Sequence, residues 1–172
     1  MSLHICSKEA MNVSKILVID SEKCNGCRAC EWACSLYKEK VINKSMIRIV
    51  KWPARGVEFP MVCVQCEVAV CEKVCPVGAI KRNEDIGALE VDKDACIGCK
   101  LCVYVCPFGG IYFDTEQRRV LKCEQCEGDP VCAKVCPTEA LQYVEATRAN
   151  MWKKRAAIER ITELLQIVFH PG

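Results

Sequence analysis

No long hydrophobic run is present in this sequence. The longest apolar stretches, ILVI at 16–19 and LCVYVC at 101–106, fall short of the roughly 18 residues that a membrane-spanning helix needs. The first twenty residues lack the apolar core, the twin arginine and the cleavage site of an export signal. Charge of one sign is not concentrated either, because 24 basic residues are dispersed among 22 acidic ones. We therefore expect a cytoplasmic protein that neither inserts into membranes nor binds nucleic acid.

Catalytic signatures are also missing. The sequence has no glycine-rich phosphate-binding loop, no dinucleotide-binding fingerprint and no serine–histidine or cysteine–histidine constellation. Its 2 histidines, His4 and His170, lie near opposite ends of the chain, where an incidental solvated histidine is the ordinary case. We expect a protein without an active site of its own.

Cysteine, by contrast, is abundant, with 17 in 172 residues. All but one fall into four groups, each of which opens with CxxC and closes with CxxxC, so the chain carries four copies of one unit. The groups are Cys24, Cys27, Cys30 and Cys34; Cys63, Cys66, Cys71 and Cys75; Cys96, Cys99, Cys102 and Cys106; and Cys123, Cys126, Cys132 and Cys136. Cys6 lies in an expected flexible leader, residues 1–15, and is given no role.

Thiolates at this spacing are typical of iron–sulfur clusters. Three closely spaced cysteines wrap one face of a cubane [4Fe-4S] cluster, and a fourth, on the helix that follows, points to a neighbouring cluster. Clusters held in this way come in pairs, so four motifs predict four [4Fe-4S] clusters with sixteen cysteine ligands. Structural zinc prefers two well-separated cysteine pairs, and disulfides do not suit a reducing cytoplasm. Both alternatives fit the pattern less well.

Proline follows the last cysteine of three motifs, at positions 76, 107 and 137. Because proline lacks an N–H and restricts the residue before it, we expect the chain to turn there into a strand. Two apolar runs around a polar turn with Gly87 predict a hairpin between the second and third motifs. A shorter version over 111–123 is expected before the fourth motif.

The first motif lacks this proline. After Cys34 the sequence SLYKEK contains no turn signal, so the helix that carries Cys34 is expected to continue through Tyr37. It leads into an inserted segment with a β-like stretch at 47–52, which we expect to cover one face of the fold.

These motifs resemble those of the four-cluster ferredoxin-like iron–sulfur subunits of molybdenum and tungsten oxidoreductases, such as dimethyl sulfoxide reductase and formate dehydrogenase. The resemblance covers residues 16–145 and includes the missing proline of the first motif. The phrases CRACEWACSLYKE and CEGDPVCAKVCP look most like the small subunit of tungsten aldehyde oxidoreductase, followed by that of the tungsten benzoyl-CoA reductase complex. The resemblance implies an α+β, duplicated bacterial ferredoxin-like fold of tandem or nested two-cluster units, with an insertion after the first motif.

The family's ligand exchange implies that the inner motifs pair with each other, over 63–106, and that the outer motifs, 24–34 and 123–136, do likewise. Spacing alone also allows the third motif to join the fourth. We favour the nested scheme because ILVID before the first motif and ALQYV after the last are suited to pair as terminal strands. The implied ligand sets are Cys63, Cys66, Cys71 and Cys106; Cys96, Cys99, Cys102 and Cys75; Cys24, Cys27, Cys30 and Cys136; and Cys123, Cys126, Cys132 and Cys34.

The function that these features favour is electron transfer. The resemblance implies a subunit that relays single electrons through its clusters between a large catalytic tungsten- or molybdenum-pterin subunit and an acceptor or donor, with further redox subunits or a ferredoxin as additional partners. The alternatives are a free polyferredoxin serving hydrogenase or carbon monoxide dehydrogenase, and a zinc-stabilised interaction module. Four oxidised clusters of about −2 each change the formal charge of +2 to about −6.

Two further expectations concern apolar residues. Four aromatic side chains near the motifs, those of Trp32, Tyr104, Phe108 and Tyr112, are predicted to pack around the clusters and exclude water rather than to carry electrons. Residues 146–172 are predicted to form an amphipathic helix that caps the chain's own core or docks on a partner, since apolar residues at 158, 161, 164, 165 and 168 share one stripe.

Overall fold

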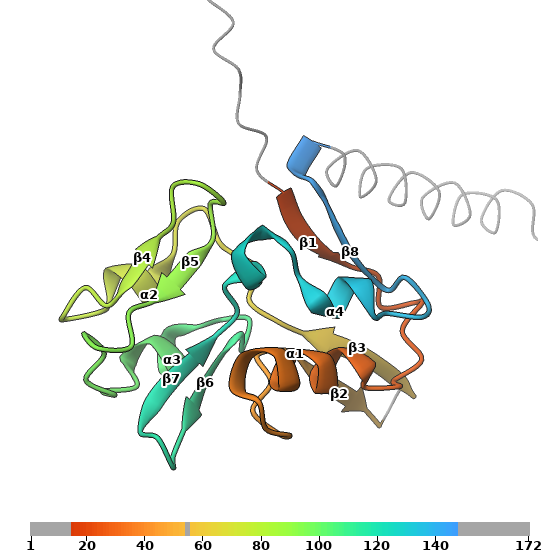
Figure 1. Cartoon of the computed structure of the whole chain (residues 1–172), viewed down its shortest axis with the longest axis horizontal. Helices are drawn as coiled ribbons and strands as arrows, with labels where there is room; N and C mark the ends of the chain where they lie inside the picture. The colour runs from red at the N-terminus through yellow and green to blue at the C-terminus, as the bar shows by residue number, and fades with distance from the viewer. Residues whose placement is uncertain (1–14, 54–55, 148–172) are drawn as a thin grey trace, which may run out of the picture.

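The computed structural model describes residues 15–53 and 56–147 (Figure 1). The leader with His4 and Cys6, and the expected C-terminal helix with His170, lie outside the described residues. Within them, the strands form four two-stranded antiparallel sheets, which are joined by short helices. No helix in this part of the chain is long and apolar enough to cross a membrane.

The first and last strands pair with each other, as the sequence predicts. Strand β1 (Lys15–Ile19) lies antiparallel to β8 (Leu141–Glu145), with Leu17 opposite Tyr143. Figure 1 shows the two strands side by side, although 121 residues separate Ile19 from Leu141 along the chain (141 − 19 − 1). This pairing brings the first motif close to the fourth.

Both expected hairpins are present. Strand β4 (Ile80–Arg82) pairs with β5 (Leu89–Val91), and β6 (Ile111–Asp114) pairs with β7 (Arg119–Lys122). Strands β4, β6 and β8 each begin five residues after the last cysteine of a motif. The three prolines therefore direct the chain into strands, as predicted.

Each motif also carries a helix at the same place, because its third cysteine is the second residue of that helix. The helices are α1 (Ala29–Glu39), α2 (Val70–Lys73), α3 (Leu101–Val105) and α4 (Val131–Lys134); a 3₁₀ turn, η1 (Gln125–Gly128), precedes α4. Helix α1 packs against α4, and α2 packs against α3. The helices are thus paired first with fourth and second with third.

Two hydrophobic cores follow this division. One contains buried cysteines of the first and fourth motifs, Cys30, Cys34 and Cys132, together with Ile47 and Leu141. The other contains Cys102 of the third motif, with Cys71 of the second packed against it, and the side chains of the two hairpins. In Figure 1 the second group, with α2, α3 and β4–β7, lies to the left of α1, α4 and the terminal strands.

The inserted segment adds a third hairpin, β2 (Arg48–Trp52) with β3 (Val57–Met61), and so confirms the strand expected at 47–52. Met46, Ile47 and Ile49 at its start are buried in the first core. The insertion therefore covers one side of the outer motifs. It is also tied to the β6–β7 hairpin by an ion pair between Lys44 and Asp114, with 2.9 Å between Nζ and Oδ2.

The turn between α1 and this hairpin is held by one buried hydroxyl. Ser35 is only 1% exposed; its Oγ donates to the carbonyl of Val41 at 2.7 Å and accepts from the N–H of Lys44 at 2.8 Å. Because the two bonds satisfy groups up to nine residues away, Ser35 fixes the path of the chain back toward Met46.

We expect Ser35→Ala to lower the free energy of unfolding by about 1–3 kcal/mol, because it removes two hydrogen bonds that hold the turn. The midpoint of denaturant-induced loss of the visible cluster absorbance, measured without oxygen, checks this. Ser21→Ala is the control, since Ser21 is exposed. Equal midpoints for the two variants would show that the Ser35 bonds do not hold the turn.

Candidate iron–sulfur cluster sites

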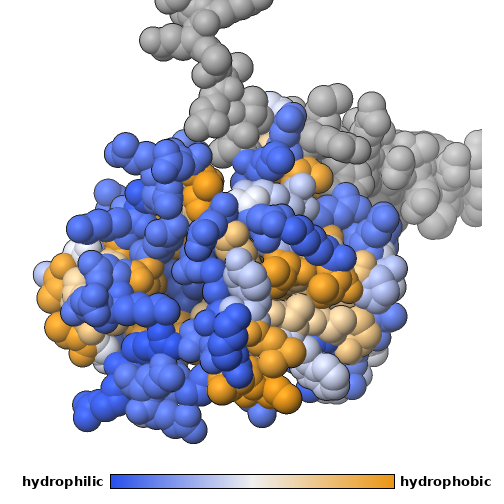
Figure 2. Space-filling model, in the orientation of Figure 1, coloured by the Kyte–Doolittle hydropathy of each residue, from blue (hydrophilic) through white to orange (hydrophobic). Residues whose placement is uncertain are grey.

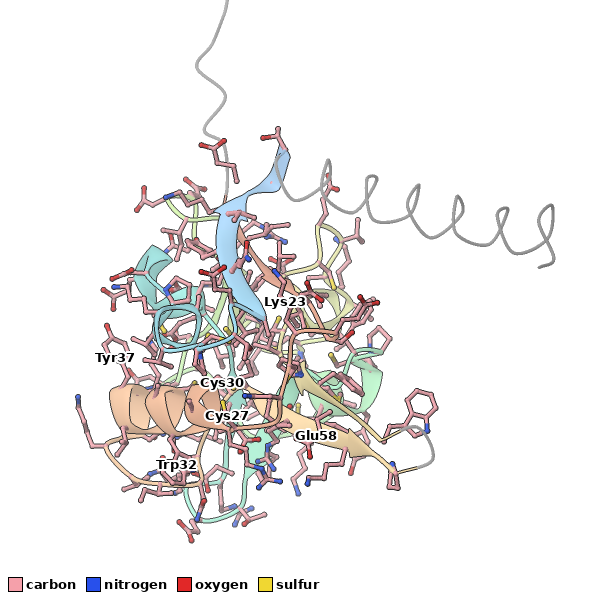
Figure 3. The ribbon with its side chains drawn as sticks, turned by 90° about the vertical axis from the view of Figure 1, so that its right-hand side faces the viewer. Lys23, Cys27, Cys30, Trp32, Tyr37 and Glu58 are labelled. Atoms are coloured by element: carbon pink, nitrogen blue, oxygen red, sulfur yellow. The ribbon has the colours of Figure 1, made fainter. Side chains whose placement is uncertain are left out.

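Two of the four implied ligand sets line cavities of their own. Set A (Cys24, Cys27, Cys30 and Cys136) lines a cavity together with Arg28, Ile49 and Leu141. Set D (Cys75, Cys96, Cys99 and Cys102) lines another with Ile80 and Val120. In each cavity three cysteines come from one motif and the fourth from its partner motif. Figure 3 shows two members of set A, Cys27 and Cys30, close together at the beginning of α1.

In each of the other two implied sets, cysteines lie close enough for one sulfur to raise the pKa of another. In set B (Cys34, Cys123, Cys126 and Cys132), burial raises the pKa of Cys132 well above its usual range, and the other three sulfurs add to this. In set C (Cys63, Cys66, Cys71 and Cys106), burial raises the pKa of Cys71, with further contributions from Cys63 and Cys106. Cys66, the remaining member of set C, lies in the same loop as Cys63.

Neighbouring sets also meet at particular cysteines. Cys30 of set A lies close enough to Cys132 of set B to raise its pKa, and Cys63 of set C acts in the same way on Cys123 of set B. Cys71 of set C likewise contributes to the raised pKa of Cys102 in set D. These charge effects link the sets in the order A, B, C, D.

Burial makes these thiols poor thiolates on their own. It raises the pKa of Cys30 and of Cys123 to about 12 and that of Cys102 to about 11. A buried sulfur becomes a stable thiolate when a positive centre lies beside it, and iron supplies that charge. All sixteen cysteines are free thiols rather than disulfides. Four convergent soft donors in an apolar cavity fit a [4Fe-4S] cluster.

The loops after Pro76 and Pro137 supply hydrogen bonds to sulfur. The N–H of Ala79 donates to Cys75 Sγ at 3.2 Å. Although burial opposes it, N–H groups of this loop lower the pKa of Cys75, and the equivalent loop after Pro137 does the same for Cys136. Such bonds stabilise a thiolate ligand, so the turn that proline starts also prepares the sulfur for iron.

Cys34 receives the equivalent bond from a different place. The N–H of Met46, in the inserted segment, lies 3.4 Å from Cys34 Sγ, and Met46 Sδ lies 3.8 Å from the same sulfur. Helix α1 continues to Glu39, as the sequence predicts, and the chain then returns to Cys34 by the turn that Ser35 holds. The first motif therefore needs no proline.

Two expectations about these motifs are wrong in part. The first is that the fourth cysteine of each motif lies on a helix, which is true only of the first motif. Cys75 and Cys136 follow the ends of α2 and α4, and Cys106 is the residue just after α3. These helices are only four or five residues long, whereas the last two cysteines of a motif are four residues apart.

The second expectation is that four aromatic side chains shield the clusters from water, and it is wrong for three of the four. Trp32 is 64%, Tyr104 80% and Phe108 50% exposed, and only Tyr112 is half-buried, with Arg48 against its ring. Trp32 and Tyr104 each follow a buried ligand by two residues, and two residues turn a helix by about 200°. An inward cysteine therefore places the aromatic outward. Figure 2 shows further hydrophobic surface over the end of α1 and the loop after it, where Leu36, Val41 and Ile42 are exposed.

Sequence reasoning missed residues that act on the ligands from other parts of the chain. Met46 is one, and Gly110 is another. A Cβ on Gly110 would lie 2.6 Å from Cys63 Cα and 2.8 Å from its nitrogen. The equivalent positions after the second and fourth motifs hold the buried Ala79 and Ala140. The glycine in CPFGG, where CPVGA and CPTEA have alanine, was the available signal.

Comparison with known proteins agrees with this site. The family model described as a 4Fe-4S dicluster domain matches residues 55–146, and a 4Fe-4S binding domain matches 15–36. One subunit of the anaerobic dimethyl sulfoxide reductase of Escherichia coli (strain K12) is 37% identical over 145 residues, 73% of this chain and 70% of that protein. The thiosulfate reductase electron transfer subunit of Salmonella typhi is 32% identical over 165 residues, 86% and 85% of the two proteins.

The chain belongs to the 4Fe-4S dicluster family, whose members bind [4Fe-4S] clusters. The resemblance drawn from the motifs is thereby confirmed. Among solved structures, the active site complex BamBC of benzoyl coenzyme A reductase with 1,5-dienoyl-CoA contains a polypeptide that is 26% identical, with a TM-score of 0.46 over 76% of this chain and 75% of that one.

We expect Gly110→Ala to disturb set C, because every atom that the new methyl group meets is backbone of Val62 or Cys63. Iron content should fall by up to about one cluster, or 4 iron atoms, measured on protein purified without oxygen. Gly56→Ala is the control: its φ of +62° strains an alanine, but nothing lies within 4 Å of the new Cβ, and Gly56 is outside the cysteine motifs. Equal iron in both variants would contradict the steric explanation.

Proposed function

We propose that this chain is an electron-transfer subunit that relays single electrons through four [4Fe-4S] clusters between a large catalytic tungsten- or molybdenum-pterin subunit and an acceptor or donor. The observation that carries the proposal is that sixteen free cysteines lie in four motifs whose helices pack first against fourth and second against third, around two cores. The names of the relatives support it, since one is an electron transfer subunit and the other belongs to a reductase.

The sixteen cysteines are proposed as iron ligands in the nested sets A to D. Sets A and B form the outer pair and sets C and D the inner pair, in a duplicated ferredoxin-like domain over residues 16–145. Three kinds of observation support this pairing: the two cavities lined by sets A and D, the packing of α1 on α4 and of α2 on α3, and the division of the buried cysteines between two cores.

The relay is proposed to run from set A through B and C to D, or in the reverse direction. Among the sixteen motif cysteines only Cys27 of set A and Cys99 of set D are exposed, whereas the others are buried or half-buried. The two terminal sets therefore each present one ligand at the surface, where an electron can enter or leave. The clusters supply the one-electron chemistry, and the chain positions them, excludes water and donates N–H groups to sulfur.

The finer assignment is to the small subunits of tungsten aldehyde oxidoreductases, acting in the cytoplasm of an anaerobic cell. It rests on CRACEWACSLYKE and CEGDPVCAKVCP, the two stretches that carry that resemblance. The first of these forms α1, whose outer side includes the exposed Trp32, Leu36 and Tyr37.

Ligand exchange between motifs gives a direct test. Cys34 lies only four residues from Cys30, yet the nested scheme places Cys34 with Cys126 in set B. We expect Cys34→Ser and Cys126→Ser to alter the same cluster signal in electron paramagnetic resonance spectra, and Cys30→Ser to alter a different one. If Cys30→Ser and Cys34→Ser alter one shared signal, the nested ligand sets are wrong.

The subunit assignment is tested by metal analysis of the protein isolated without oxygen from its own host. We expect about 16 iron atoms per chain, together with tungsten or molybdenum in a co-purifying larger subunit. The same iron content with neither metal nor partner would instead identify a free polyferredoxin. Zinc in place of iron would refute electron transfer altogether.

A further inference from the structure

A buried lysine lies between the two cluster pairs. Lys122, at the end of β7 and directly before Cys123, is 5% exposed. Its Nζ donates to the carbonyl of Leu89 at 2.7 Å, to the carbonyl of Cys123 at 3.2 Å and to Gln65 Oε1 at 3.3 Å. An ammonium group has three N–H donors, so all of them are used.

None of these acceptors carries a charge. Among residues 15–53 and 56–147, no carboxylate forms an ion pair with Lys122. A buried cation without a counter-charge is costly, and natural structures place one where an anion or a metal site balances it. The negative charge of the thiolate-bound clusters is the available balance.

Gln65 holds the lysine in place and joins the two pairs. It lies between Cys63 and Cys66 in the second motif, and its Nε2 donates to the carbonyl of Cys123 at 2.7 Å. Its Oε1 accepts from the N–H of Leu89 at 2.9 Å as well as from Lys122. One side chain thus connects set C, the β4–β5 hairpin and set B.

The charge of Lys122 lies beside both central sets. On the side of set B, its ammonium donates to the carbonyl of Cys123, a proposed ligand. On the side of set C, it donates to Gln65, which stands between the proposed ligands Cys63 and Cys66.

We propose that Lys122 is a positioning residue whose buried charge raises the reduction potentials of the clusters in sets B and C, and that Gln65 fixes it there. The proposal rests on the function proposed above. A cluster core passes from +2 to +1 when it gains one electron and returns to +2 when it gives that electron to its neighbour, with no bond made or broken. A fixed cation beside a cluster favours the more negative, reduced state. The lysine therefore makes the two central clusters the easier ones to reduce.

The test is a potentiometric titration of the full chain with its clusters, followed by electron paramagnetic resonance. Lys122→Met keeps most of the length of the unbranched side chain but removes its charge. We expect the two signals assigned by Cys126→Ser and Cys66→Ser to shift so that, at a fixed ambient potential, the ratio of reduced to oxidised cluster falls by about tenfold, or 59 mV for one electron. The signals of sets A and D should change by less.

Three further variants separate charge from packing. Lys122→Arg retains the charge and should retain both potentials. Gln65→Glu places a carboxylate against the ammonium and should lower the same two potentials as Lys122→Met. Lys81→Met is the control, because Lys81 is exposed on β4 and its charge is screened by water.

Unchanged potentials in Lys122→Met with full iron content would overturn the proposal, since the lysine would then only satisfy carbonyls. If Lys122→Met does not retain its iron, the potentials of Gln65→Glu are measured instead. Unchanged potentials in that variant would also overturn the proposal. Failure of the proposed function is read separately, from the iron count and the number of cluster signals of the unaltered chain.

Discussion

The burial of thiolate charge is the constraint on which the rest of this structure depends. Sixteen of the 17 cysteines in this chain of 172 residues fall in the four motifs, and several of their sulfur atoms lie in its two hydrophobic cores rather than around them. Burial alone raises the pKa of Cys30 and Cys123 to about 12. These buried sulfur atoms would hold iron, and bound iron would supply the positive charge that balances their thiolates. Cluster binding would then contribute directly to the stability of the fold.

The four copies of the motif share one local structure around their cysteines, and they differ where another segment of the chain lies against a motif. A short helix begins beside the third cysteine, and a left-handed residue at 78, 109 or 139 follows the proline. After the second and fourth motifs, this loop turns N–H groups toward sulfur. Gly110 replaces the alanine of the other copies because the backbone of Cys63 lies against it. In the first motif the donor is Met46, since α1 is extended and the chain must return from the insertion.

Much of this arrangement could be predicted from the sequence because the spacing of cysteine, proline and glycine is a local signal. The hairpins, the continuation of α1 beyond Tyr37 and the pairing of β1 with β8 follow from it. The prediction that Trp32 and Tyr104 shield the clusters is wrong, because closeness in sequence to a ligand does not set the direction of a side chain on a helix. The direction is set by the buried cysteine two residues earlier. The contact of Met46 with Cys34 and that of Gln65 with Lys122 join distant segments, and no spacing rule gives them.

Charges near the clusters differ in how far other charges cancel them. The carboxylate of Glu58 lies against Gly26, in the loop of set A, but Lys51 Nζ is 2.6 Å from it, so the pair presents little net charge. Lys38 is paired with Glu124 near set B in the same way. Lys122 has only neutral partners among the described residues, and it is buried where water screens it least. In the proposed relay we therefore expect this uncancelled cation, buried at the junction of the two pairs, to outweigh the paired charges around it, at the point where an electron would pass from one pair of clusters to the other.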